Sequence, residues 1–434
     1  MYKQTATTVL IVICALVPGK LSASESNYQP YVIGLRASGM AGAVNADAEG
    51  MDACYYNPAG LADSYTGSIS ASANLYGIQY TKTDDNLYPG DDLKASTLAT
   101  IPTGISFIYP YNDKMKFAFS VFVPMQISAK EIEAFTSENI ELNENKEHYY
   151  NFSNSLQVFL IGPSLGYKVN SNLNLGVSAY CAYTTSSQFL NLFWKDYNYS
   201  FSSNYKYSVY AALISSGIQY KLTDVFNLGL TVTSPSIRIA GKGTLYESAV
   251  MNSSQIQEPK SLYKGDLKAD NGIPAQIKMG ISYNVPKNFA LGFDATYHFA
   301  HSYDWLEEDG ASPPPNDTDS IRRSHRAVTD FQAGGEYYFK NKYPVRAGFF
   351  TSFSSAPDAD PGKPNELPQI DLYGFTGSFG IEVEHVITTL GAQYVFGNGQ
   401  TVGYKLIDKD TLEGTVVNTH EDSIYISLST AYIF

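Results

Sequence analysis

The stretch that decides the fold is the last one of the chain, "DSIYISLSTAYIF", residues 422–434. Ile424, Leu428 and Tyr432 fall on one face of an extended chain, and Ser423 falls on the other. Successive side chains of a β-strand point to opposite sides, so this alternation predicts a strand with an apolar and a polar face. We therefore expect a strand that separates an apolar environment from a polar one.

The same period-two pattern recurs along most of the chain. It is found in "NLNLGVSAYCAY" (172–183), "FALGFDATYHF" (289–299), "DFQAGGEYYFK" (330–340) and "PVRAGFFTSF" (344–353). Segments of about ten residues with one apolar and one polar face are typical of transmembrane β-barrels. A soluble β-sandwich alternates too. Very short turns at 111–113, 169–172 and 285–288, between long polar loops, favour a barrel with two unlike rims.

The fold class that we predict is all-β, a transmembrane antiparallel β-barrel of 14 strands covering residues 64–434. Strands are expected at 64–82, 93–110, 113–130, 150–169, 172–194, 199–221, 224–243, 266–286, 288–305, 323–340, 343–355, 370–383, 385–398 and 420–434. Long loops are expected at 131–149, 244–265, 306–322, 356–369 and 399–419.

Residues 1–23 have the pattern of a cleaved export signal. Lys3 precedes the apolar run 9–17, and the small-residue site "LSA" ends at Ala23. The apolar run is too short to span a bilayer as a helix. Together with the barrel pattern, this signal predicts a bacterial outer-membrane protein.

The amino-acid composition limits the classes of protein to which the chain can belong. Aromatic residues make up 14% of the chain and charged residues only 16%, whereas soluble domains carry about a quarter. The formal charge of -13 argues against a nucleic-acid partner.

No metal-ligand spacing and no catalytic or phosphate-binding motif occurs, so we expect no enzyme, no metal and no cofactor. Cys54 and Cys181, which remain after the signal, are not expected to pair.

Residues 24–63 precede the first strand and are the candidate plug. A barrel of fourteen strands is too wide for its wall side chains to fill, so either a plug or a water channel must occupy the lumen. The segment is rich in Gly and Ala, which suits close packing, and it contains "DACYYNPAGLA" at 52–62. Asn-Pro initiates turns and Gly60 can end one. We expect an N-terminal hatch inside the barrel.

At these residues the chain resembles a known family. The pattern "SGMAGAV…AD…YYNPAGLA" is similar to the N-terminal hatch of the FadL family (OMPP1/FadL/TodX) of outer-membrane transporters for hydrophobic compounds. The stretches "IPTGISFIYPYNDKMKFAFSVFVP", "PAQIKMGISYNVP", "DFQAGGEYYFKNKYPVRAGFFTSFSSAPD" and "ITTLGAQYVFGNG" resemble the family in the same order. The resemblance extends over nearly the whole mature chain. The long loops of the chain show no similarity to the family.

The resemblance implies a mechanism. In this family the hatch blocks the lumen, a kink in the third strand opens the wall sideways, and the ligand leaves laterally into the membrane. Asn57, Pro58, Ala59 and Gly60 would then form a fixed hatch turn; the alternative is a tight turn with a structural role alone. Pro124 and Met125 interrupt the alternation of the expected third strand and are the candidate lateral opening; the alternative places Pro124 beyond the membrane band.

Alternation places two cations, Lys278 and Arg346, on the lumenal face as candidate ligand-binding residues. A guanidinium suits the carboxylate of a fatty acid. Asp294, Glu336 and His298 are expected on the same face, so the alternative is a structural ion-pair network in the wall.

The expected function is passive uptake of hydrophobic compounds such as long-chain fatty acids, with the ligand captured from outside and released laterally. The alternatives are an aromatic-hydrocarbon channel of the same fold and a general diffusion porin. An outer-membrane enzyme is disfavoured because the sequence shows no nucleophile in a catalytic arrangement. Partners would be hydrophobic small molecules, membrane lipid and lipopolysaccharide. The family suggests a monomer.

Overall fold

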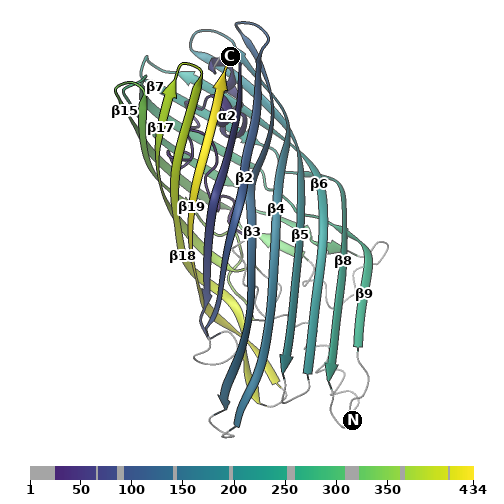
Figure 1. Ribbon diagram of the computed structural model, residues 1–434. Coiled ribbons are helices and arrows are strands. Elements are labelled where there is room, and N and C mark those ends of the chain that lie inside the picture. Colours follow the sequence, from purple (N-terminus) through teal and green to yellow (C-terminus); the bar gives the residue numbers. More distant parts are fainter. Residues whose placement is uncertain are drawn as a thin grey trace.

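The computed structural model describes residues 25–64, 67–85, 92–139, 144–194, 199–251, 260–307, 322–361, 367–408 and 411–434. Long, inclined strands close into a barrel, and an N-terminal segment is coiled inside it near the end where the C-terminus lies (Figure 1). We call that end, which carries the short turns, the turn end, and the opposite end the loop end. The expected export signal at 1–23 lies outside the described residues.

The wall consists of β1 (Ser68–Thr83), β2 (Leu93–Pro110), β3 (Met115–Asn139), β4 (Glu144–Lys168), β5 (Leu173–Trp194), β6 (Tyr199–Lys221), β7 (Phe226–Thr233), β8 (Ile237–Met251), β9 (Lys260–Ala269), β10 (Gln276–Val285), β11 (Phe289–His298), β13 (Leu306–Glu307), β15 (Val328–Phe339), β16 (Tyr343–Ser352), β17 (Gln369–Val383), β18 (Val386–Asp408) and β19 (Thr411–Ile433). A separate two-stranded sheet pairs β12 (His301–Asp304) with β14 (Arg322–His325). Inside lie the helix α2 (Gly50–Tyr56) and the 3-10 helix η1 (Pro58–Asp63).

The wall is a closed antiparallel barrel of 14 strands, as predicted. β1 pairs with both β2 and β19, which closes the sheet. β6 pairs with β7 along one half of its length and with β8 along the other, so β7 and β8 together make one wall strand. β9 and β10 make the next one, because they pair with β8 and β7 respectively.

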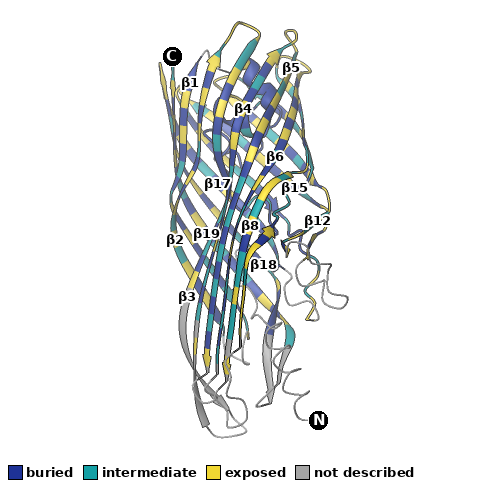
Figure 2. Ribbon diagram, turned by 90° about the vertical axis from the view of Figure 1, so that its right-hand side faces the viewer, coloured by how far each residue is buried: buried dark blue, intermediate teal, exposed yellow. Residues whose placement is uncertain are grey.

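Burial alternates along the strands of the wall, as β1 and β17 show most clearly (Figure 2). On β19, Ile424, Leu428 and Tyr432 are exposed while Ser423 and Ser427 are buried in the lumen, as the quoted stretch predicts. Exposed aromatic side chains gather at the turn end: Tyr109, Tyr111, Phe117, Tyr167, Tyr220, Phe226, Phe289, Tyr337, Phe339, Phe379, Tyr432 and Phe434. Such a girdle is typical of the interface between a bilayer and water.

Three of the predicted long loops are largely wrong. β3 and β4 continue to Asn139 and from Glu144, and β18 and β19 continue to Asp408 and from Thr411, where loops were expected at 131–149 and 399–419. Most of 244–265 is likewise strand in β8 and β9. The sequence alternation fades there, although the backbone ladder continues.

Four of the predicted continuous strands are broken. One of them, 323–340, is interrupted at 326–327, and its first residues belong to β14, outside the wall. The expected strand 224–243 is interrupted at 234–236 and the expected strand 266–286 at 270–275, where Pro235 and Pro274 have no N–H to give to a ladder. Ser236 and Ile273 hold the two breaks together, because each backbone N–H is bonded to the other residue at 2.9 Å. The expected strand 288–305 ends at His298, and the chain then leaves the wall to form β12. Among the described residues, no helix has the length and apolarity needed to cross a bilayer.

Candidate ligand cavity and hatch

Residues 25–64, which we call the hatch, are buried almost throughout inside the barrel. Asp52 on α2 organises the turn before it: its carboxylate accepts the backbone N–H groups of Leu35, Arg36 and Ala37 at 2.7, 2.9 and 2.7 Å. Burial raises the pKa of Asp52, and these three hydrogen bonds oppose that rise. The hatch is therefore a folded segment organised around the buried carboxylate of Asp52.

The predicted hatch turn, Asn57–Gly60, starts η1. The Asn57 side chain accepts from the Ala59 N–H at 3.1 Å, which caps the 3-10 helix, and donates to the carbonyls of Asn45 and Ile218 at 2.8 and 3.0 Å. Pro58 occupies the first helical position, where a missing N–H costs nothing. Asn57 thus joins two parts of the hatch to β6.

Glycines of the wall make room for the hatch backbone. A Cβ added to Gly176, Gly229, Gly292 or Gly334 would lie within 2.1–2.4 Å of a backbone atom of Pro58, Asn45, Ala43 or Met40 respectively. These glycines sit on β5, β7, β11 and β15, and others occupy the same inward row. The complete row is Gly166, Gly176, Gly217, Gly229, Gly280, Gly292, Gly334 and Gly348. At most of these glycines the hatch and the wall meet main chain to main chain, whereas Gly217 and Gly280 face side chains first.

Lys278, a predicted ligand-binding residue, is paired within the protein. Its Nζ lies 3.3 Å from Asp294 Oδ2 and donates to the Gly42 carbonyl at 3.1 Å, and it stands 4.9 Å from the centre of the Tyr56 ring. Asp294 also accepts the backbone N–H of Asn45 at 3.0 Å. The charge of Lys278 is therefore used to seat the hatch, as the alternative of a structural network expects.

Arg346, the second predicted ligand-binding residue, lies elsewhere. Its Nε donates to Glu336 Oε2 at 2.6 Å, and the other oxygen of Glu336 accepts from Arg36 of the hatch at 3.0 Å. Arg36 continues to Asp47 at 3.1 Å. Arg346 takes part in a buried chain of alternating charges between hatch and wall, and it does not line the cavity described below.

Pro124 and Met125 lie at an irregularity of the wall. The ladder between β3 and β4 shifts register between Phe122 and Met125, so one extra residue bulges out of β3. The ladder between β2 and β3 ends at the pair Gly104 and Phe122. In the described chain, residues 93–103 of β2 make no pair with β3. Beyond Phe122 the two neighbouring strands separate.

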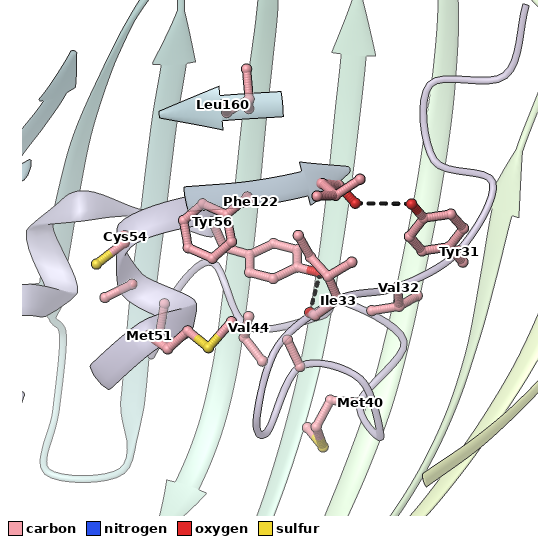
Figure 3. Packing of buried hydrophobic residues seen from close by; sticks show 14 of the residues in the cluster. Tyr31, Val32, Ile33, Met40, Val44, Met51, Cys54, Tyr56, Phe122 and Leu160 are labelled. Atoms are coloured by element: carbon pink, nitrogen blue, oxygen red, sulfur yellow. Dashed lines mark hydrogen bonds between the residues drawn. The ribbon is translucent and has the colours of Figure 1, made fainter. Parts of the chain in front are cut away.

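The hatch reaches this irregularity. The Tyr31 hydroxyl donates to the Val123 carbonyl at 2.9 Å, which satisfies a backbone group that the bulge leaves without a ladder partner (Figure 3). The Tyr55 ring lies 5.3 Å from the Phe122 ring, and Tyr56 packs in the same cluster. Aromatic side chains of the hatch thus support the bulge from inside.

A cavity of about 160 Å³ lies between the hatch, the bulge and the broken part of the wall. Pro124 and Met125 line one side of it, residues 271–274 line another, and Lys278 lies at its hatch side. The ring-bearing and apolar side chains that line it are Tyr28, Tyr55, Tyr56, Tyr180, His298, Tyr303, His325, Pro124, Met125, Leu156, Val158, Leu160, Leu213, Ile273 and Pro274. The arrangement can hold a small apolar molecule.

Most of these residues were not predicted as site residues. Leu156, Val158 and Leu160 face the lumen on β4 although lumenal positions of such a strand are usually polar. This run of apolar residues on the polar face is a sequence signal that could have located the cavity. Tyr28, Tyr303 and His325 come from segments outside the barrel ladder, and only the three-dimensional structure brings them there.

Comparison with known proteins identifies a family. The model of the family described as outer membrane protein transport protein (OMPP1/FadL/TodX) matches residues 29–434. No curated protein sequence matches the chain.

Several solved structures share the fold at low sequence identity. The P. putida toluene transporter TodX superposes with a TM-score of 0.62 and 14% identity, covering 93% of this chain and 99% of that one. A FadL homologue from Pseudomonas aeruginosa gives 0.61 and 16%, with 94% and 100% coverage, and the CymD monoaromatic hydrocarbon channel gives 0.60 and 15%, with 93% and 98%.

Proposed function

The chain belongs to the OMPP1/FadL/TodX family of outer-membrane transport proteins, and from that premise we propose that it is a passive channel for small aromatic compounds. A ligand from the extracellular loop end would rest in the cavity beside the hatch and leave sideways between β2 and β3. Neither a cofactor nor an energy source is required, because the ligand moves down its own gradient.

The size and lining of the cavity carry this proposal. An engineered cavity of about 150 Å³ lined by apolar side chains binds benzene in another protein. The present cavity, at about 160 Å³, has a similar volume and is lined largely by aromatic and aliphatic side chains. Burying the apolar surface of a ring contributes roughly 25 cal/mol per Å². A single aromatic ring fits this volume, whereas the chain of a long fatty acid would have to extend beyond it.

The charges near the cavity favour a neutral ligand. Lys278 is the cation among the lining residues, and its Nζ is held by Asp294 and by the Gly42 carbonyl. A carboxylate bound there would have to replace Asp294, which also accepts hydrogen bonds from the hatch backbone. An uncharged ring leaves these contacts in place and needs only the aromatic surfaces around it.

The separation of β2 from β3 supports lateral release. Pro124 and Met125 line the cavity, and beyond Phe122 the ladder that would seal β3 against β2 is absent from the described chain. An apolar molecule that passes between the two strands enters lipid and keeps its apolar surface out of water. The opposite route, along the lumen to the periplasm, meets the hatch, whose backbone contacts the wall at the row of glycines.

Uptake by cells that lack a transporter of their own tests the proposal. We expect expression of the protein to give saturable uptake of labelled toluene and much weaker uptake of labelled oleate. Leu213→Trp should fill the cavity and remove the gain in toluene uptake. The matched control is Leu228→Trp, on the exposed face of β7, which should leave that gain intact. Stronger uptake of oleate than of toluene would assign the fatty-acid class instead, and no uptake of either would refute the channel.

A further inference from the structure

The outward face of β6 indicates where the bilayer ends. Four apolar or aromatic side chains are exposed along it: Tyr220, Ile218, Ile214 and Tyr210. The stretch 210–220 has the length of a strand that crosses a bilayer, about 9–11 residues, and a tyrosine stands at each end of it, as is typical of the two interface girdles. From Ser208 to the loop end the outward side chains of β6 are polar. The extracellular edge of the bilayer therefore lies near Tyr210.

Three lysines lie just beyond this edge on β6, β8 and β9, which are neighbours in the wall (Figure 1). Lys242 of β8 stands opposite Ser208 of β6, and Lys206 of β6 stands opposite Thr244 of β8. Lys268 of β9 stands opposite Lys242. Residues opposite each other in an antiparallel pair share a face of the sheet, and all three lysines are exposed. We call these three lysines, with the hydroxyls of Ser208 and Thr244, the lysine patch.

Most of the positive charge of the lysine patch has no partner inside the protein. Like charges directly opposite each other destabilise a sheet, so the pair Lys242 and Lys268 calls for an anion nearby. Lys268 lies 3.4 Å from the carboxylate of Glu307. Lys206 and Lys242 make no ion pair among the described residues, and Asp266 of β9 pairs with none of the three there. The ammonium groups of Lys206 and Lys242 are therefore available to an external anion.

A second pair of facing lysines shows how the protein neutralises such charges when it does so itself. Lys82 of β1 stands opposite Lys94 of β2. The carboxylates of Asp84 and Asp92 each lie 2.8 Å from the Lys82 Nζ. Two carboxylates thus compensate one ammonium group of that pair. The lysine patch has this provision only at Lys268, so it differs from an ordinary network of surface ion pairs.

We infer that the lysine patch binds the phosphate groups of a phosphorylated lipid in the outer leaflet. Ammonium groups form strong charge-assisted hydrogen bonds with phosphate, and the two hydroxyls of the patch can donate to the same oxygens. Exposed Ile214 and Ile237 lie on the bilayer side of the patch, where they can contact the acyl chains of the same lipid. An inorganic phosphate ion would gain no such apolar contact. The inference does not depend on the compound that the channel carries.

The test measures binding of bisphosphorylated lipid A to the purified protein in detergent by native mass spectrometry. We expect Lys206→Ser combined with Lys242→Ser to raise the Kd for this lipid about thirtyfold, because each basic residue near an anionic lipid contributes roughly a factor of five. Dephosphorylated lipid A should bind the wild-type protein and this variant equally weakly. The matched control, Lys114→Ser combined with Lys342→Ser, removes two exposed lysines from the turn end and should leave the Kd within about twofold.

All variants should keep the heat-dependent gel mobility of a folded barrel, and Lys206→Gln combined with Lys242→Gln decides if the serine variant does not fold. An unchanged Kd in the patch variant, an equal loss in the control, or equal binding of phosphorylated and dephosphorylated lipid A would overturn the inference. Displacement of lipid A by millimolar inorganic phosphate would assign the patch to free phosphate and overturn it as well. None of these outcomes depends on toluene uptake, so failure here leaves the proposed function standing.

Discussion

Two adjacent glycines on β15 face opposite surroundings. A Cβ on Gly334 would lie 2.4 Å from the carbonyl oxygen of Met40 in the hatch, while a Cβ on Gly335 would meet the Leu291 side chain at 3.4 Å, an ordinary contact. The first position therefore requires glycine because another main chain approaches it, and the second does not. The sequence cannot distinguish these two glycines. The contact with the hatch in the folded structure distinguishes them.

This pair gives a prediction with an internal control. Gly334→Ala should lower the free energy of unfolding by about 1–3 kcal/mol, the usual cost of inserting a methyl group into a filled space. Gly335→Ala should leave it within about 0.5 kcal/mol. Denaturant unfolding in detergent, followed by tryptophan fluorescence, measures both. Equal stability of the two variants would mean that the hatch does not press on the wall at this point.

The individual charges show where reasoning from sequence ends. Alternation places Lys278, Arg346, Asp294 and Glu336 in the lumen, and all four are buried there. Which acid pairs with which base depends on cross-strand register: Glu336 stands opposite Arg346, and Asp294 lies one strand from Lys278. Arg36, which completes the network from the hatch, has no periodic pattern that could reveal it.

At the scale of elements, the bulge of β3 is the feature on which the proposed lateral release depends. Deleting Pro124 removes the extra residue, so Phe122 and Met125 could both pair with β4 in one continuous register. We expect this deletion to bring β3 back toward β2 and to reduce toluene uptake to about a tenth, since a barrier of roughly 1.4 kcal/mol already gives a factor of ten.

The control for this deletion is Pro124→Ala, which keeps the extra residue and should keep most of the uptake. Both variants should retain the heat-dependent gel mobility of a folded barrel. Uptake that survives the deletion in a barrel that is still folded would show that the ligand leaves by another route.

Element boundaries were predictable only where the bilayer imposes a pattern. The strands at 93–110 and 199–221 agree with β2 and β6 to the residue, because one face of each meets lipid and the other the lumen. At the loop end the sequence alternation weakens, and β3, β4, β18 and β19 are longer there than predicted. The breaks at 234–236 and 270–275 coincide with prolines, but a proline alone does not show whether two breaks lie side by side.

At the scale of the whole molecule, the hatch decides between a carrier of apolar ligands and an open pore. The hatch contacts the wall through glycines on β4 to β16 and through side chains farther round, where Thr376, Gln393 and Ser429 bond to hatch carbonyls. A lumen occupied in this way should carry little ion current. A porin of comparable width keeps an aqueous channel.

Ion conductance in a planar bilayer tests this occupancy. The wild-type protein should give little steady current, and replacing Asn57 and Pro58 together by alanine should raise it, because the replacement removes the cap of η1 and two hydrogen bonds to carbonyls. Toluene uptake should change in the same variant while the barrel stays folded. Asn172→Ala, in an exposed turn, serves as the control. A large ohmic current through the wild-type protein would favour a general diffusion porin over the proposed channel for aromatic compounds.

The close contact between hatch and wall also has a consequence for biogenesis. The hatch precedes every described strand, so in a chain exported with its N-terminus first the hatch would arrive before the strands. Where glycines leave no room for even a methyl group, a finished barrel would have to stretch to admit the segment afterwards. Assembly is simpler if the sheet curls around a hatch that has already folded about Asp52, so that the plug acts as the template on which the wall closes.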